Sequence, residues 1–134
     1  MSKMSKRLAD AVDGAGGTQR IREMESQWSD TLRTRLAAMF PGTTPDYVRV
    51  YWSFDAANPT GRWNASAVLT VLDGCAPVSF FAASSDVADA VGTFIREAPT
   101  TYKAELARIA DDLRNQAARC LDRATRLDAL AGRS

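Results

Sequence analysis

Apolar residues recur every three or four positions from Thr18 to Phe40, which predicts an amphipathic helix over residues 18–40. The intervening positions are mostly charged, so we expect one face of this helix to pack on a core and the other to meet water. Pro41-Gly42 then supplies the residues that usually end a helix. The apolar positions are Ile21, Met24, Trp28, Leu32, Leu36, Met39 and Phe40.

Three later segments have patterns typical of β-strands. Residues 47–54 alternate, residues 63–72 are rich in small and β-branched side chains, and residues 75–82 follow directly after a turn signal. An irregular turn around Asn58-Pro59-Thr60-Gly61 should join the first two strands, whereas Asp73-Gly74 predicts a two-residue hairpin turn before the third. Pro77 cannot donate to a β-ladder, so we expect the third strand at an edge of the sheet.

Two helices are expected after the strands. Ser84 or Ser85 can cap the first, and Pro99 should end it near Ala98, because helical geometry is disfavoured in the residue before a proline. The second should run over about residues 101–130. The predicted fold is therefore α+β in the order α-β-β-β-α-α, with a three-stranded antiparallel sheet, helices on one face and a long C-terminal helix.

The 134 residues are expected to form one domain over residues 18–134, preceded by a flexible arm. This arm, residues 1–17, holds a short helical fragment over Lys6–Asp13. Gly14-Ala15-Gly16-Gly17 follows it and favours no regular structure.

The predicted C-terminal helix would span roughly 45 Å, longer than a compact domain of this size, so part of it should project. A heptad pattern places Leu106, Leu113, Cys120 and Leu127 at a, and Tyr102, Ile109, Gln116, Arg123 and Leu130 at d, beside a row formed by Ala110, Ala117 and Ala124. A projecting apolar stripe favours a homodimer, and the alternative is packing back on the helix of residues 18–40. The expected dimer interface contains Leu106, Ile109, Leu113, Ala117, Cys120 and Leu127.

Composition argues against several functions. The chain has no histidine, and its two cysteines form no CxxC motif, which disfavours a transition-metal site. We expect no enzymatic activity and no cofactor, because no carboxylate pair or phosphate-binding glycine motif is present in the sequence. Seventeen Lys and Arg against 16 Asp and Glu give no field that would attract nucleic acid or a membrane. We expect a cytoplasmic protein in which Cys75 and Cys120 are small buried hydrophobes.

The second face of the first strand carries Tyr47, Arg49 and Tyr51, and we expect it to be exposed. Tyrosine and arginine are enriched where proteins bind one another, and they also stack on nucleobases. The loop of residues 55–62 is a second candidate, with Arg62 and the adjacent Trp63, although the flanking tryptophans Trp52 and Trp63 are expected to pack structurally rather than to bind. We therefore expect a protein partner of unknown identity, and nucleic acid is the alternative.

The order helix, three antiparallel strands, helix across residues 18–98 resembles the topology of double-stranded RNA-binding domains. Those domains carry a lysine-rich cluster at the start of the second helix, where this sequence reads Ser84-Ser85-Asp86-Val87-Ala88-Asp89. Acids at that position would repel phosphates, so the resemblance does not extend to RNA binding. The chain also resembles small phage or mobile-element accessory proteins, which implies a protein that binds or blocks a host macromolecule.

Overall fold

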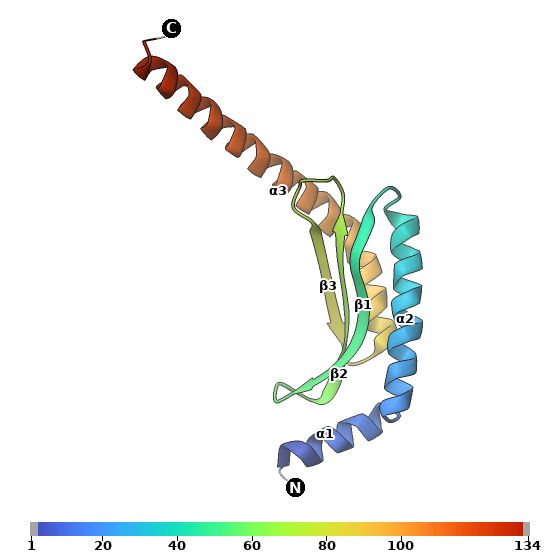
Figure 1. Ribbon diagram of the computed structural model, residues 1–134. Coiled ribbons are helices and arrows are strands. Elements are labelled where there is room, and N and C mark those ends of the chain that lie inside the picture. The colour runs from blue at the N-terminus through green and yellow to red at the C-terminus, as the bar shows by residue number, and fades with distance from the viewer. Residues whose placement is uncertain (1–2, 133–134) are drawn as a thin grey trace.

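The computed structural model describes residues 3–132 (Figure 1). The α+β class, the three-stranded antiparallel sheet and the long C-terminal helix are confirmed, but the predicted order of elements is wrong. The observed order is α-α-β-β-β-α, because the arm contains a helix and the two C-terminal helices are one. The elements are α1 (Lys3–Gly14), α2 (Thr18–Met39), β1 (Thr44–Asp55), β2 (Asn58–Thr70), β3 (Val78–Ser84) and α3 (Val87–Leu130).

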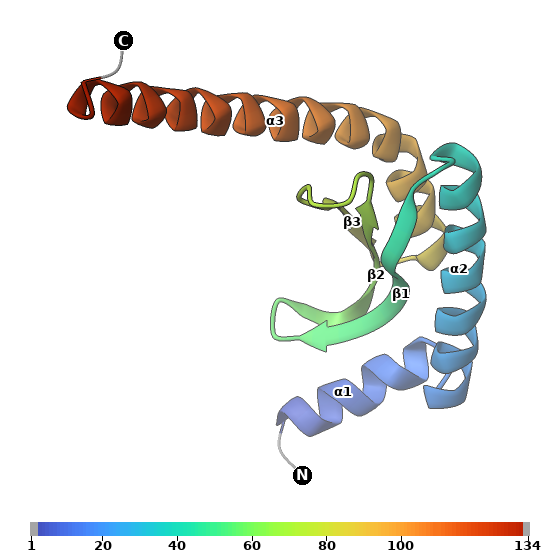
Figure 2. The same cartoon turned by 45° about the horizontal axis from the view of Figure 1, so that its top comes forward.

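The arm expected over residues 1–17 is largely the helix α1. Ala11 is buried, and Val12 packs against the hydrophobic core. Tertiary contacts of this kind are what stabilise a helix that would be too short to persist alone. Gly16 and Gly17 follow with φ of 101° and 94°, values that glycine adopts readily, and they let the chain turn into α2. Figure 2 shows α1 beneath the curved end of the β1–β2 hairpin.

The sheet has the order β1-β2-β3, which confirms β3 as an edge strand. Directly paired residues share a face, so Val50, Ala65 and Ala82 point to the same side of the sheet and are all buried. α2 and the first part of α3 cover this face, and Leu32 of α2 is fully buried against it. The opposite face is open and concave (Figure 2).

The outer edge of β1 is occupied by polar side chains of α2. Glu25 Oε2 accepts from the Trp52 backbone N–H at 2.9 Å, and Ser29 Oγ accepts from the Val50 N–H at 2.8 Å. Residues four apart on a helix, such as Glu25 and Ser29, are about 6 Å apart along its axis. Residues two apart on a strand, such as Val50 and Trp52, have nearly the same spacing, so each side chain of α2 meets one N–H of β1. An edge strand whose donors are paired in this way offers few groups to another strand.

The predicted two-residue turn between the second and third strands is wrong. The last paired residues are Leu69 and Val78, so residues 71–77 form a longer connection. A tight turn does form at Asp73-Gly74, where Cys75 N–H donates to Leu72 O at 3.2 Å, but the strands do not reach it. Pro77 explains part of this difference, because it has no N–H with which to extend the ladder.

Asn58 to Gly61 belong to β2 rather than to an irregular turn, and the hairpin reverses at Ala56-Ala57. Asp55 pairs with Asn58, and its Oδ1 accepts hydrogen bonds from the backbone N–H groups of Ala57 and Asn58, both at 2.9 Å. Hydrogen bonding from Asn58 lowers the pKa of the Asp55 carboxyl below its ordinary value. The side chain of Asp55 therefore stabilises a tip that contains no glycine.

The predicted helix break at Pro99 is wrong, because α3 continues through it. Asp86 caps the N-terminus of α3, where its side chain accepts from the Asp89 N–H at 3.0 Å. Pro99 forfeits one helical hydrogen bond, but residues on both sides of it pack on the body: Ala98 is buried, and Tyr102 stacks on Phe40 with ring centroids 4.3 Å apart. This packing outweighs the local preference, and α3 bends near residue 100 by the colour scale of Figure 2.

Candidate functional site

The second half of α3 projects from the body into solvent (Figures 1 and 2). Every residue from 111 to 132 is exposed, including Leu127 at 64% and Leu130 at 85%. The alternative expectation, that the C-terminal helix packs back on α2, is therefore wrong for the residues of α3 beyond residue 110 within one copy. None of the helices within residues 3–132 is long and apolar enough to cross a membrane.

The predicted dimer residues divide between the body and the projecting segment. Ile109 is buried and Leu106 is half-buried, so both already pack within one copy. Leu113, Ala117, Cys120 and Leu127 are exposed. The expectation that both cysteines are buried is wrong, because Cys120 lies on the projecting segment and Cys75 is only half-buried.

The projecting segment carries one uninterrupted apolar row, which we call the α3 row. The a and d positions expected from the sequence are broken by Gln116 and Arg123, whereas steps of four and three residues that use the alanines meet no polar residue. Sequence reasoning treated these alanines as a separate feature, and their alternation with the leucines was the signal that could have joined them. The α3 row is Leu106, Ala110, Leu113, Ala117, Cys120, Ala124, Leu127 and Ala131.

An apolar groove lies where the α3 row meets the connection between β2 and β3. Its volume is about 120 Å³. Leu72 on its rim is 65% exposed, and Leu113 opens it toward the projecting segment. The groove therefore continues the α3 row onto the body. Its lining is Val71, Leu72, Cys75, Ala76, Leu106, Ile109, Ala110 and Leu113.

The open face of the sheet brings together most of the predicted binding residues. Tyr47 is 40% exposed, and the guanidinium carbon of Arg49 lies 4.7 Å from the centre of the Tyr51 ring. Arg62 makes a similar contact with the exposed Phe81 at 5.9 Å. Stacking on an aromatic ring holds each guanidinium in place, and Arg62 Nε is buried without a hydrogen-bond partner within the described residues.

Trp63 does not join this surface. It is 5% exposed and pairs directly with Trp52 on the helix-covered side of the sheet, so it contributes to the core. Asn64, its neighbour in β2, points to the open side but is fully buried, and its Nδ2 donates to Ser53 Oγ at 2.9 Å. Asn64 Oδ1 has no partner within the described residues, which leaves a buried acceptor unsatisfied beneath the open face.

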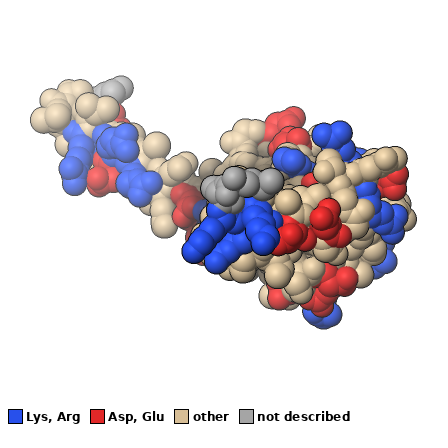
Figure 3. Space-filling view, turned by 90° about the horizontal axis from the view of Figure 1, so that it is seen from below, with Lys and Arg blue, Asp and Glu red and all other residues tan. Residues whose placement is uncertain are grey.

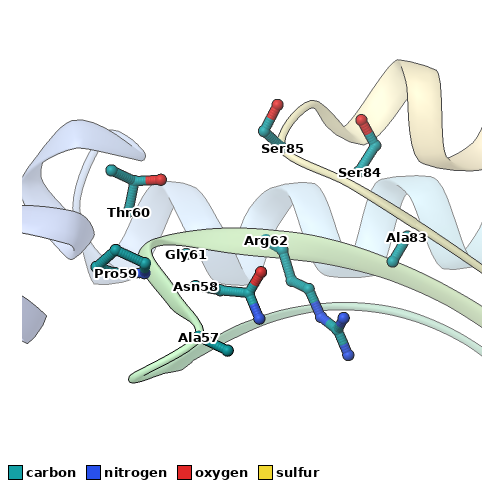
Figure 4. A pocket seen from close by; sticks show the side chains of 9 residues that line it. All are labelled: Ala57, Asn58, Pro59, Thr60, Gly61, Arg62, Ala83, Ser84 and Ser85. Atoms are coloured by element: carbon teal, nitrogen blue, oxygen red, sulfur yellow. The ribbon is translucent and has the colours of Figure 1, made fainter.

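A polar pocket of about 300 Å³ lies between the hairpin tip and the segment that joins β3 to α3. Its lining is Ala57, Asn58, Pro59, Thr60, Gly61, Arg62, Ala83, Ser84 and Ser85. In Figure 4 the side chains of Arg62 and Ser85 point away from each other rather than into a shared space. The residues that line this pocket include no carboxylate, lysine or histidine that could serve as a base for the two serines.

Positive and negative side chains are both present on the face of the molecule that Figure 3 shows. Figure 3 shows Lys and Arg gathered toward one end of the body and again along the projecting segment, where acids lie among them. Two arginines of the segment pair with acids of the same helix: Arg114 with Asp111 at 3.0 Å and Arg126 with Asp122 at 3.2 Å. Among residues 3–132, no group of three or more Cys, Asp or Glu side chains is placed to hold a metal ion.

The chain matches no family model, no curated protein and no solved structure.

Proposed function

We propose that this protein is a non-enzymatic protein-interaction module that self-associates through the projecting segment of α3 and binds a further protein on its open sheet face. The observation that carries the proposal is the exposed α3 row of residues 113–131, which continues into an apolar groove on the body. Leucine side chains gain about 1.5–3 kcal/mol each when they move from water into an apolar contact.

A partner would also stabilise the helix itself. Most of the stability of a helix in a protein comes from tertiary packing of its amphipathic face rather than from intrinsic helix propensity. Residues 111–132 are all exposed in one copy, so they gain little from packing against their own body. Self-association supplies the missing contacts with a surface that every molecule of this protein carries.

The open face is the surface available for a different protein. Arg49, Tyr51, Arg62 and Phe81 form two cation–π pairs there, and arginine and aromatic residues dominate binding hot spots. The same residue types can stack on nucleobases, but the near balance of charge provides little counterion release, which dominates nucleic-acid affinity. We therefore rank a protein partner above nucleic acid.

The test is light scattering across a range of protein concentrations, with absorbance at 260 and 280 nm recorded on the same peak. We expect a dimer at high concentration and a protein-like absorbance ratio. Ala117→Glu should shift the population to monomer, whereas the adjacent Ala118→Glu should not, because both alanines are exposed in one copy and only Ala117 lies on the α3 row. A monomer at every concentration would contradict self-association, and a raised 260 nm signal that salt removes would favour nucleic acid.

The open face needs a separate test. Arg49→Ala with Tyr51→Ala should abolish capture of the partner protein from lysate, and that variant should retain the oligomeric state of the wild type. The matched control is Thr125→Ala, which changes an exposed position off the α3 row on the projecting segment. Retention of every captured protein by a folded double variant would remove the open face from the proposal.

A further inference from the structure

We infer that the partner of the α3 row is the α3 row of a second copy running antiparallel, with Cys120 of each chain opposite Ala124 of the other. This inference rests on the proposed self-association and adds its orientation and register. In this register Leu113 lies opposite Ala131 of the second copy, and Ala117 lies opposite Leu127. The two bodies then sit at opposite ends of the paired helices.

The connection between β2 and β3 argues for this orientation. Leu106, Ile109, Ala110 and Leu113 face residues 71–76 of their own chain across the groove, so this connection stands beside the α3 row as far as Leu113 and leaves only the narrow groove between them. A parallel partner would place its own residues 106–113, with its own connection, in that same space. An antiparallel partner brings only its helix end there, and the pairing covers the stretch from Leu113 to Ala131.

The sizes of the opposed side chains are complementary. Each layer of the antiparallel register sets an alanine of one chain against a leucine or cysteine of the other, so large and small residues alternate across the interface. Alanine lets two helix backbones approach closely, and the facing leucine fills the space that remains. A parallel register would instead stack alanine on alanine and leucine on leucine, which leaves layers of unequal width.

Charges beside the α3 row agree with the same register. In an antiparallel pair Arg114 flanks Asp128 of the second copy, twice by symmetry, and Leu121 meets its own counterpart on the same side. Arg114 also pairs with Asp111 of its own chain, and a guanidinium has enough donors for both carboxylates. Arg123 faces its counterpart across the two-fold axis, which is the one unfavourable feature of this arrangement.

The groove receives the end of the partner helix. Leu130 is the most exposed of the large apolar residues that the structure describes, and Ala131 of the second copy comes opposite Leu113 at the mouth of the groove. The exposed Leu72 on the rim is then covered by the last turn of the partner. The antiparallel pair therefore accounts for the exposed leucines at both ends of the projecting segment.

The main test is a charge-swap cycle measured as the dimer dissociation constant by sedimentation at low salt. Arg114→Asp and Asp128→Arg should each weaken the dimer about fivefold, because two exposed ion pairs become repulsive. The double variant should recover most of the wild-type affinity. Arg123→Gln should tighten the dimer, whereas in a parallel pair Arg123 would lie near Asp128 and its loss would weaken binding. A double variant no tighter than the weaker single variant would overturn the register.

Disulfide cross-linking gives an independent measurement in a Cys75→Ser background. Oxidation should link the chain that carries both Cys120 and Ala124→Cys, and it should link the chain that retains Cys120 alone at least tenfold more slowly. Rapid linkage through Cys120 alone would show a parallel pair and overturn the inference while leaving the proposed self-association intact. A protein that stays monomeric would instead overturn the proposed self-association itself.

Discussion

Replacing Gly61 with alanine should destabilise the curved hairpin that shapes the open face. Gly61 has φ of 82°, and an added Cβ would lie 2.2 Å from Cζ2 of Trp52. The backbone conformation alone disfavours alanine by about 1–2 kcal/mol. Displacing the indole, which stacks on Phe54 at 6.4 Å, should add about 1–3 kcal/mol, as overpacking does in protein cores. We expect the free energy of unfolding to fall by about 3 kcal/mol in total.

Gly74→Ala is the matched control for this prediction. Gly74 has φ of 81°, but an added Cβ there meets nothing within 4 Å, so only the backbone term applies. Urea denaturation followed by tryptophan fluorescence measures both variants, since Trp52 itself reports on the site. The difference between them isolates the steric contact with the indole. Equal losses in the two variants would refute the packing of Trp52 over Gly61.

Three further predictions concern other parts of the body. Ser29→Ala should lower the free energy of unfolding by about 1–2 kcal/mol in urea denaturation, because the Val50 N–H loses its acceptor on the β1 edge, and no loss would contradict that bond. The Ala57 amide shift in NMR should titrate with Asp55, and its midpoint should lie below the ordinary pKa of an aspartate. The carboxylate stabilises the hairpin tip above that ordinary pKa, and this contribution is lost as pH falls through the lowered pKa of Asp55. A midpoint at or above the ordinary pKa would contradict the hydrogen bonds to Asp55. Pro99→Ala should raise the free energy of unfolding by about 1–3 kcal/mol, since α3 regains a hydrogen bond, and a decrease would show that the proline-induced bend itself supports packing.

The strand pattern of β1 was predictable because burial alternates there with the period of the sheet. Val48 and Val50 are buried, and Tyr47 and Arg49 are exposed, as the sequence indicates. The connection between β2 and β3 was not predictable in the same way. Asp73-Gly74 does form a tight turn, but whether the paired strands extend to such a turn depends on their tertiary contacts. Here Val71 and Cys75 line the groove beside α3 instead of pairing with each other.

At Pro99 the local sequence predicted the end of a helix that in fact continues. A proline inside a helix costs about 3 kcal/mol or more, and the packing of Ala98 and Tyr102 on either side of Pro99 offsets this cost. Trp63 was ambiguous for a related reason: its face depends on the register with β1, which pairs it with Trp52. The α3 row was visible in the sequence, but that residues 111–132 have no cover in one copy could only come from the structure.

The two edges of the sheet and the exposed α3 row favour association of copies through helices over association through strands. The β1 edge is paired with Glu25 and Ser29, so a second sheet would have to displace them. The β3 edge is flanked by Pro77, which cannot extend a ladder. Since several of the exposed leucines lie on α3 beyond the body, the largest gain in buried apolar surface comes from helix pairing. Helix pairing also leaves the open face, with its two stacked arginines, available for a different partner in each copy.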